Sequence, residues 1–152
     1  MSSQMEGFMT IEENKHIAHQ FFEAINTRDG AAMVDRLLAP DFRLNEVAFD
    51  PNEWKDLFVW AQTEVPDWHF TVEDIMAEDD RVAVRLSVSG TPRTQWRLYR
   101  TNGQSFVSRG FCFFRIVNSV IVEAWDQFHE LWELQQLGAL PTPQQAEAGA
   151  QI

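Results

Sequence analysis

Residues 68–90 read WHFTVEDIMAEDDRVAVRLSVSG, and this stretch decides the fold class. Apolar and polar side chains alternate on both sides of the acidic trio at 78–80. A period of two is typical of half-buried strands, and a short polar interruption between two such runs indicates a β-hairpin. We therefore predict antiparallel strands over 68–77 and 81–90.

The alternating pattern continues toward the C-terminus. TQWRLYR at 94–100 and SFVSRGFCFFRIV at 105–117 flank the turn signal TNGQ, which predicts a second hairpin. The pair NS at 118–119 then turns the chain into VIVEAWDQFH at 120–129. The second half of the chain is thus predicted to be an antiparallel meander.

Upstream of these strands the apolar period is close to 3.6, which predicts helices. Thr10 begins a capping-box pattern ahead of the first helix, and a second short helix is predicted over 31–38, ended by Pro40. A strand is predicted over 41–47. Asp50, followed directly by proline, is a strong N-cap for a third helix.

This order of elements predicts an α+β fold, with three N-terminal helices packed on one face of a strongly curved antiparallel sheet. A chain of 152 residues is most simply one domain. We assign the domain to residues 10–138 and a flexible N-terminus to residues 1–9. The small, polar, proline-containing segment 139–152 is predicted to be a flexible tail.

Charge and composition exclude several classes of function. The net charge is −11, so a nucleic-acid backbone would be repelled. No apolar run approaches the ~20 residues that a membrane span needs, and the N-terminus does not have the pattern of a signal peptide. Cys112 is the single cysteine, which fits a reducing compartment. We predict a cytoplasmic protein that binds neither nucleic acid nor membrane.

Four stretches carry a resemblance to a known family. They are FFEAINTRDGAAMVDRLLAPDF at 21–42, VPDWHFTVEDIMAEDDRVAVRLSVSGT at 65–91, RGFCFFRI at 109–116 and IVEAWDQFHELWELQQLGALP at 121–141. In order and spacing, the chain resembles the SnoaL-like polyketide cyclases of the nuclear transport factor 2-like superfamily, over roughly residues 14–142. The resemblance implies a cone-shaped fold around a deep apolar pocket and a homodimer formed through the outer face of the sheet.

The resemblance also implies a general base near the end of the last strand. In the family, that acidic residue follows a Glu-x-Trp pattern and precedes a Gln-Leu-Gly, and this chain has His129 at its position. Trp125, Gln127 and His129 share one strand face, so we predict that His129 is the base and that the other two contact substrate. A hydrogen-bonded rim histidine is the alternative. If the strand contains a bulge, Asp126 replaces His129 as the favoured base.

Further substrate-binding candidates come from other elements. Asn45 stands where many relatives have a histidine, and Cys112 stands where they often have Asp or Asn. If the strand face of Cys112 lines the pocket, the resemblance implies a more apolar wall here than is usual. Phe22, Trp54 and Phe58 line either the pocket or the core. His16 and His19 have no third ligand in a supporting motif, so the sequence predicts no metal and no cofactor.

Two hypotheses about function follow. The first is a cofactor-independent cyclase or isomerase that uses acid–base, aldol-type chemistry on an apolar, oxygenated small molecule; an epoxide-opening hydrolase or cyclase is a variant of it. The second is a non-catalytic protein of the same fold that binds a small hydrophobic ligand. A titratable residue at the family's base position favours the enzyme, whereas the small number of polar residues expected in the pocket favours the binding protein.

Overall fold

The computed structural model describes residues 9–150. The N-terminal segment assigned to residues 1–9 therefore lies outside the described residues, except for Met9. In chain order the elements are α1 (Ile11–Asn26), α2 (Gly30–Leu37), β1 (Leu38–Leu44), β2 (Val47–Ala48), α3 (Pro51–Glu64), β3 (His69–Glu78), β4 (Arg81–Gly90), β5 (Gln95–Trp96), β6 (Tyr99–Arg100), β7 (Phe106–Val117), β8 (Val120–Phe128), α4 (Glu130–Gln136) and α5 (Pro143–Ala150).

The first three helices begin within one residue of their predicted positions. At α1, the Glu13 N–H donates to the Thr10 hydroxyl at 3.1 Å, and the Thr10 N–H donates to the Glu13 carboxylate at 2.7 Å. At α3, the Asn52 N–H donates to the Asp50 carboxylate at 2.9 Å. Each cap satisfies an N–H group that the helix itself leaves unpaired.

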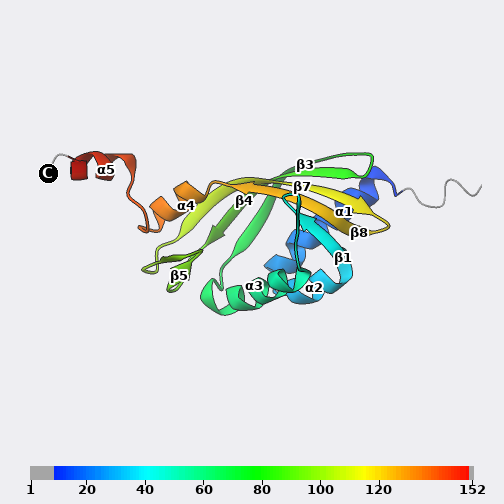
Figure 1. Cartoon of the computed structure of the whole chain (residues 1–152), viewed down its shortest axis with the longest axis horizontal. Helices are drawn as coiled ribbons and strands as arrows, with labels where there is room; N and C mark the ends of the chain where they lie inside the picture. The colour runs from blue at the N-terminus through cyan, green and yellow to red at the C-terminus, as the bar shows by residue number, and fades with distance from the viewer. Residues whose placement is uncertain (1–8, 151–152) are drawn as a thin grey trace, which may run out of the picture.

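The main sheet has six strands in the order β2-β1-β8-β7-β4-β3. The pairs β3–β4 and β7–β8 are antiparallel, as predicted. The pair β4–β7 is also antiparallel, whereas β1 runs parallel to β8. Helices α1, α2 and α3 lie on one face of the curved sheet (Figure 1). The predicted fold class is confirmed, with β1 as the one strand that departs from the antiparallel order.

The core between helices and sheet is aromatic. The ring of Phe114 on β7 lies 5.4 Å from that of Phe21 and 5.9 Å from that of Phe22, both on α1. All three side chains are buried. Because truncating a buried Phe typically costs 3–5 kcal/mol, this cluster is a main source of the attachment between α1 and the sheet.

Strand β1 begins earlier than predicted. Helix α2 ends at Leu37, and the strand starts at the next residue instead of after Pro40. Pro40 lies where the β1–β8 register shifts, between Leu38 and Arg43. A proline has no N–H to donate, and an irregular stretch of strand tolerates that loss better than a regular ladder does.

The predicted hairpin between residues 94–100 and 105–117 is wrong. Instead, β7 pairs directly with β4, and residues 95–100 form a separate small hairpin in which β5 pairs with β6. The hairpin turns at Arg97, which has a φ of 54°. The backbone N–H groups of Thr94 and Gln95 donate to the carboxylate of Glu64 on α3, so they are not available to β7.

The C-terminal segment 139–152, predicted as a tail, contains a helix. The Gln145 N–H donates to the Thr142 hydroxyl at 3.3 Å, and the Thr142 N–H donates to the Gln145 side chain at 2.9 Å, which caps α5. None of the residues of α5 is buried. In Figure 1 this helix projects away from the sheet.

Strand β8 contains one extra residue. Glu123 lies opposite Arg115 on β7, but Ile121 lies opposite Ile116, so Val122 has no counterpart. Such a bulge changes which alternate residues face the core. Ile121 is buried before the bulge, and Ala124 is buried after it.

Candidate functional site

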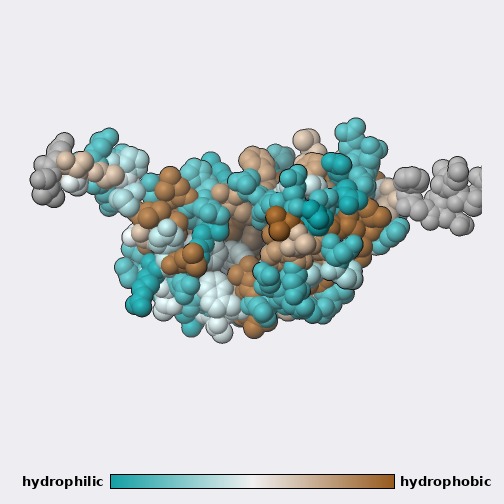
Figure 2. Space-filling view, in the orientation of Figure 1, coloured by the Kyte–Doolittle hydropathy of each residue, from teal (hydrophilic) through white to brown (hydrophobic). Residues whose placement is uncertain are grey.

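A cavity of about 510 Å³ lies between the helices and the inner face of the sheet. This volume is in the usual range for small-molecule sites. Its aromatic lining consists of Phe21, Phe22, Trp54, Phe58, Trp60, Trp68, Phe70, Trp96, Phe114 and Phe128. The space-filling view in Figure 2 shows this side of the molecule hollowed, with hydrophobic side chains around the hollow.

Asp126 lines this cavity. It lies opposite Cys112 of β7, which is itself buried and inward-facing. The residues next to Asp126 on the same face of β8 are Ala124 and Phe128, and both also line the cavity. The bulge at Val122 therefore places the Asp126 carboxylate in the apolar cavity. A bulge is the case in which the sequence predicts Asp126, and not His129, as the favoured base.

Asn45 holds Asp126 in place. Its side-chain amide donates to Asp126 Oδ1 at 3.0 Å, and its carbonyl oxygen accepts from the Asp126 N–H at 3.0 Å. The Asn45 N–H donates to the Ala124 carbonyl at 2.9 Å. Asn45 has a φ of 51°, a left-handed conformation that asparagine adopts more readily than most residues. The predicted substrate contact is thus a side chain that lies against the base candidate and is not among the residues lining the cavity.

The predicted position of His129 is wrong. His129 is the N-cap of α4, where its Nδ1 accepts from the Trp132 N–H at 3.2 Å, and its ring lies 5.8 Å from that of Trp132. It is exposed and does not line the cavity. The geometric reason for choosing His129 as the base is therefore removed.

Trp125 and Gln127 share the outward face of β8. Trp125 packs against Phe113 of β7 with ring centroids 5.7 Å apart, and neither residue lines the cavity. The alternation from 123 to 129 was predicted correctly, but it was assigned to the wrong side of the sheet. The bulge is the physical reason, because one added residue exchanges the two faces of the strand.

Phe22, Trp54, Phe58 and Cys112 line the cavity as predicted. Burial raises the pKa of the Cys112 thiol, and the negative charge of Asp126 raises it further. The thiol therefore stays protonated near neutral pH and is a poor nucleophile. Cys112 serves as a small wall residue beside the carboxylate.

Glu133 on α4 also lines the cavity, and sequence analysis did not predict it. Its Oε2 accepts from Trp96 Nε1 at 2.9 Å and from Arg97 Nε at 3.1 Å. Arg97 also forms an ion pair with Glu130 at 3.0 Å. No local pattern in the sequence marks Glu133, because Trp96 and Arg97 lie 37 and 36 positions away from it.

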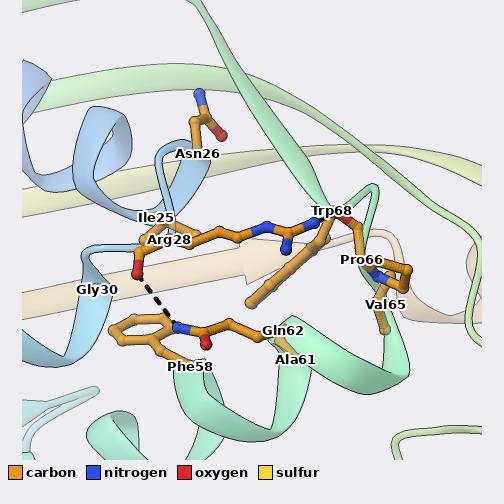
Figure 3. A pocket seen from close by; sticks show the side chains of 10 residues that line it. All are labelled: Ile25, Asn26, Arg28, Gly30, Phe58, Ala61, Gln62, Val65, Pro66 and Trp68. Atoms are coloured by element: carbon orange, nitrogen blue, oxygen red, sulfur yellow. Dashed lines mark hydrogen bonds between the residues drawn. The ribbon is translucent and has the colours of Figure 1, made fainter.

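A second pocket, of about 30 Å³, shares Ile25, Phe58 and Trp68 with the lining of the main cavity (Figure 3). It is large enough for a water molecule or two. Beside it, Gln62 of α3 donates to the Arg28 carbonyl at 3.1 Å, the hydrogen bond drawn in Figure 3. This contact connects α3 to the turn between α1 and α2, so we assign the small pocket to packing.

Residues 9–150 contain neither a metal-binding cluster nor a membrane-spanning helix. No group of three or more His, Cys, Asp or Glu side chains in this range has the arrangement of a metal site. None of its helices is both long and apolar enough to cross a membrane.

The model of the SnoaL-like polyketide cyclase family matches residues 16–137. The chain belongs to the SnoaL-like polyketide cyclase family. No curated protein sequence matches it.

Solved structures of this family and fold superpose on most of this SnoaL-like chain. IdmH of Streptomyces antibioticus, proposed to be a polyketide cyclase, is 25% identical with a TM-score of 0.71, over 82% of this chain and 98% of its own. AclR of Streptomyces galilaeus, proposed to be a hydroxylase, is 26% identical with a TM-score of 0.75, over 87% and 100%. A SnoaL-like polyketide cyclase of Agrobacterium tumefaciens, 19% identical with a TM-score of 0.72 over 86% and 100%, supports the fold alone.

Proposed function

We propose that this SnoaL-like protein is a cofactor-independent cyclase or isomerase in which Asp126 is the general base. The observation that carries the proposal is a carboxylate on the wall of a 510 Å³ apolar cavity, held by a neutral amide. A mostly apolar cavity strengthens the electrostatic interactions of this carboxylate.

The chemistry needs only the substrate and this carboxylate. Asp126 takes a proton from a carbon that lies between two carbonyl groups and leaves an enolate. The enolate carbon attacks a further carbonyl carbon of the same molecule, which forms a carbon–carbon bond and breaks the C=O π bond. The alkoxide then takes the proton back from Asp126. The product is an isomer of the substrate, and the carboxylate is regenerated.

The lining supports an apolar, oxygenated substrate. Aromatic side chains from α1, α3 and the sheet provide flat apolar walls, which suit fused or partly aromatic rings. The indole N–H of Trp68 is buried and makes no hydrogen bond within the described residues.

A non-catalytic ligand-binding protein is the second candidate. The observation that favours it is the small number of polar groups around the cavity: besides Asp126 and the Cys112 thiol, they are Gln95, Arg97 and Glu133, of which the last two already bond to each other. An epoxide-opening enzyme is the third. It would use Asp126 and Glu133 as a pair of acids on one cavity.

The outer face of the sheet supports the predicted homodimer. Phe111 is 64% exposed and Val107 is 48% exposed, and both lie on the outward face of β7 beside the Phe113–Trp125 pair. Adjacent exposed apolar side chains of this kind are typical of interaction surfaces. We propose a cytoplasmic homodimer through this face, and a monomeric mass by light scattering would contradict the dimer.

Proton exchange tests the enzyme directly. The protein is incubated in D₂O with aromatic β-keto esters, and deuterium entry at the activated carbon is followed for wild type, Asp126→Asn and His129→Ala. We expect exchange above the protein-free rate in wild type and His129→Ala, and its loss in Asp126→Asn. Exchange that survives in Asp126→Asn contradicts the assignment of the base. Binding without exchange, seen as a raised melting temperature, favours the ligand-binding protein.

A further inference from the structure

Glu133 on α4 is buried, which is unusual for an acidic side chain. Its side chain is 2% exposed, and it is the one acidic residue in the buried class within residues 9–150. It nevertheless lines the large cavity. Burying a carboxylate is costly unless its oxygens are hydrogen-bonded, so the partners of both oxygens matter.

The two oxygens of Glu133 are used very differently. Oε2 receives the Trp96 indole N–H at 2.9 Å and two groups of the Arg97 guanidinium, each at 3.1 Å. Oε1 accepts no hydrogen bond from any described residue. It is also absent from the fully buried atoms that lack a partner, which are Asn14 Oδ1, Trp68 Nε1 and Ser108 Oγ. Oε1 therefore keeps a small accessible surface, and the open space that Glu133 borders is the cavity.

We propose that Glu133 Oε1 is the acceptor for a hydroxyl group of the bound molecule, and that Glu133 selects neutral, hydroxylated polyketides. This inference rests on the proposed function and names the substrate class for the same cavity. A hydroxyl hydrogen bond to a carboxylate is charge-assisted and about twice as strong as a neutral one. Asp126 acts on the reacting carbon, whereas Glu133 reads a hydroxyl group elsewhere on the molecule.

The charges at this end of the cavity exclude other polar groups. A ketone or ether oxygen has no proton to donate to Oε1. Both acceptors would lose hydrogen bonds to water and gain none from each other. A carboxylate would face two acidic side chains of the cavity, Asp126 and Glu133. Arg97 would not neutralise it, because its guanidinium is already paired with Glu133 and Glu130.

The experiment compares two probes that differ in one group. A hydroxynaphthyl β-keto ester and its methyl ether are titrated into the protein, and the dissociation constants are measured by calorimetry. Wild type should bind the hydroxyl probe about 10–100-fold more tightly, the range expected for a hydrogen bond to a charged group. Equal binding of the two probes by wild type overturns the proposal without the need for any variant.

Glu133→Gln provides the sharper comparison. Trp96 and Arg97 are both donors, so the new amide turns its oxygen toward them and its NH₂ group toward the cavity. The preference for the hydroxyl probe should disappear, and a ketone in its place should bind better than before. Glu130→Gln is the matched control, because Glu130 bonds to the same Arg97 but does not line the cavity. A Glu133→Gln protein that keeps the hydroxyl preference overturns the proposal.

The two proposals fail in different ways. Asp126→Asn should lose proton exchange and keep the hydroxyl preference, whereas Glu133→Gln should lose the preference. No exchange in wild type together with a clear hydroxyl preference removes the enzyme and leaves the Glu133 assignment intact. Exchange that depends on Asp126, with no preference for the hydroxyl probe, supports the enzyme and overturns the Glu133 assignment.

Discussion

Two carboxylates line the same cavity, and the protein holds them with different kinds of partner. Asp126 is bonded by the neutral amide of Asn45, at 3.0 Å. Glu133 is bonded by the guanidinium of Arg97 and by an indole N–H. A neutral amide orients a carboxylate without pairing its charge, whereas a guanidinium forms an ion pair with it. The comparison supports the proposed proton transfer by Asp126 and the proposed recognition of a hydroxyl group by Glu133.

The largest expected effect separates the two roles. Asp126→Asn keeps the shape and the bond to Asn45 but removes the base, so the exchange rate should fall about 10²–10⁴-fold. The free energy of unfolding should change by less than about 1 kcal/mol, measured by urea titration. A variant that loses stability in proportion to its activity would show that Asp126 is structural.

Glu133→Ala should mainly lower the stability of the fold, in contrast to Asp126→Asn. It leaves the Trp96 N–H and part of the Arg97 guanidinium without their partner, which costs several kcal/mol when the pair is fully buried. Arg97 keeps Glu130 and is one-third exposed, so we expect a loss of about 2–3 kcal/mol. In a chain of this length that corresponds to a melting temperature about 5–10 °C lower. Glu130→Ala is the control and should change it by about 2 °C or less.

Asn45→Gly tests the hydrogen bonds that hold Asp126. Glycine accepts the φ of 51° without strain, so the turn is kept while the amide is lost. We expect kcat to fall about 10-fold with KM nearly unchanged, because Asp126 would be less well oriented. Asn45→Asp should be worse than Asn45→Gly, since it places a second negative charge beside Asp126. Equal rates in wild type and Asn45→Gly would contradict the positioning role.

Acid should weaken the attachment of the β5–β6 hairpin. The Thr94 N–H lowers the pKa of Glu64 from its ordinary 4.5, opposed by burial and helped by the Thr94 hydroxyl and the Gln95 N–H. Burial raises the pKa of Asp67, but hydrogen bonds from Thr91 outweigh it and lower it from 3.8. Groups with lowered pKa values stabilise the fold above their unfolded values, and this contribution is lost as pH falls through their folded values.

Stability should therefore fall as pH decreases from about 4.5, and the slope should be smaller in Glu64→Gln. The measurement is urea unfolding at several pH values below 5. A Glu64→Gln protein with the wild-type slope would show that this carboxylate does not hold the hairpin. Glu53→Gln is the matched control, because Glu53 is an exposed acid at the other end of α3.

The smallest effect is expected for His129→Ala. The exchange rate should match that of wild type, because His129 lies outside the cavity. Loss of the N-cap of α4 should cost about 0.5–1 kcal/mol of unfolding free energy. A rate that falls with this substitution would restore the histidine as a participant in the chemistry.

The fold could be predicted because its signals are local. Capping residues such as Thr10 and Asp50 start helices wherever they occur, and strict alternation over 81–90 admits little besides a strand. The face of β8 was not predictable in the same way. One extra residue, Val122, exchanges the two faces, and no feature of its side chain distinguishes a bulge from a regular strand position.

Glu133 and the β5–β6 hairpin were missed for a different reason. Both depend on contacts between residues far apart in the sequence: Trp96 meets Glu133 across 37 positions, and Thr94 meets Glu64 across 30. A pattern read along the chain reports on neighbours, so it assigned 94–100 to a strand by its alternation alone. Hydrogen bonds to Glu64 instead hold this segment away from the main sheet, as a separate hairpin.

Cys112 gives the cavity a chemical reporter of its own. It is the single thiol of the chain, it is 7% exposed, and it lies opposite Asp126 on the inner wall. A thiol reagent must enter the cavity to reach it, so a bound ligand should protect it from labelling. Trifluoromethyl labelling at this one position would add a fluorine nucleus beside the carboxylate. Its NMR signal would follow ligand exchange at the inner wall without any engineered cysteine.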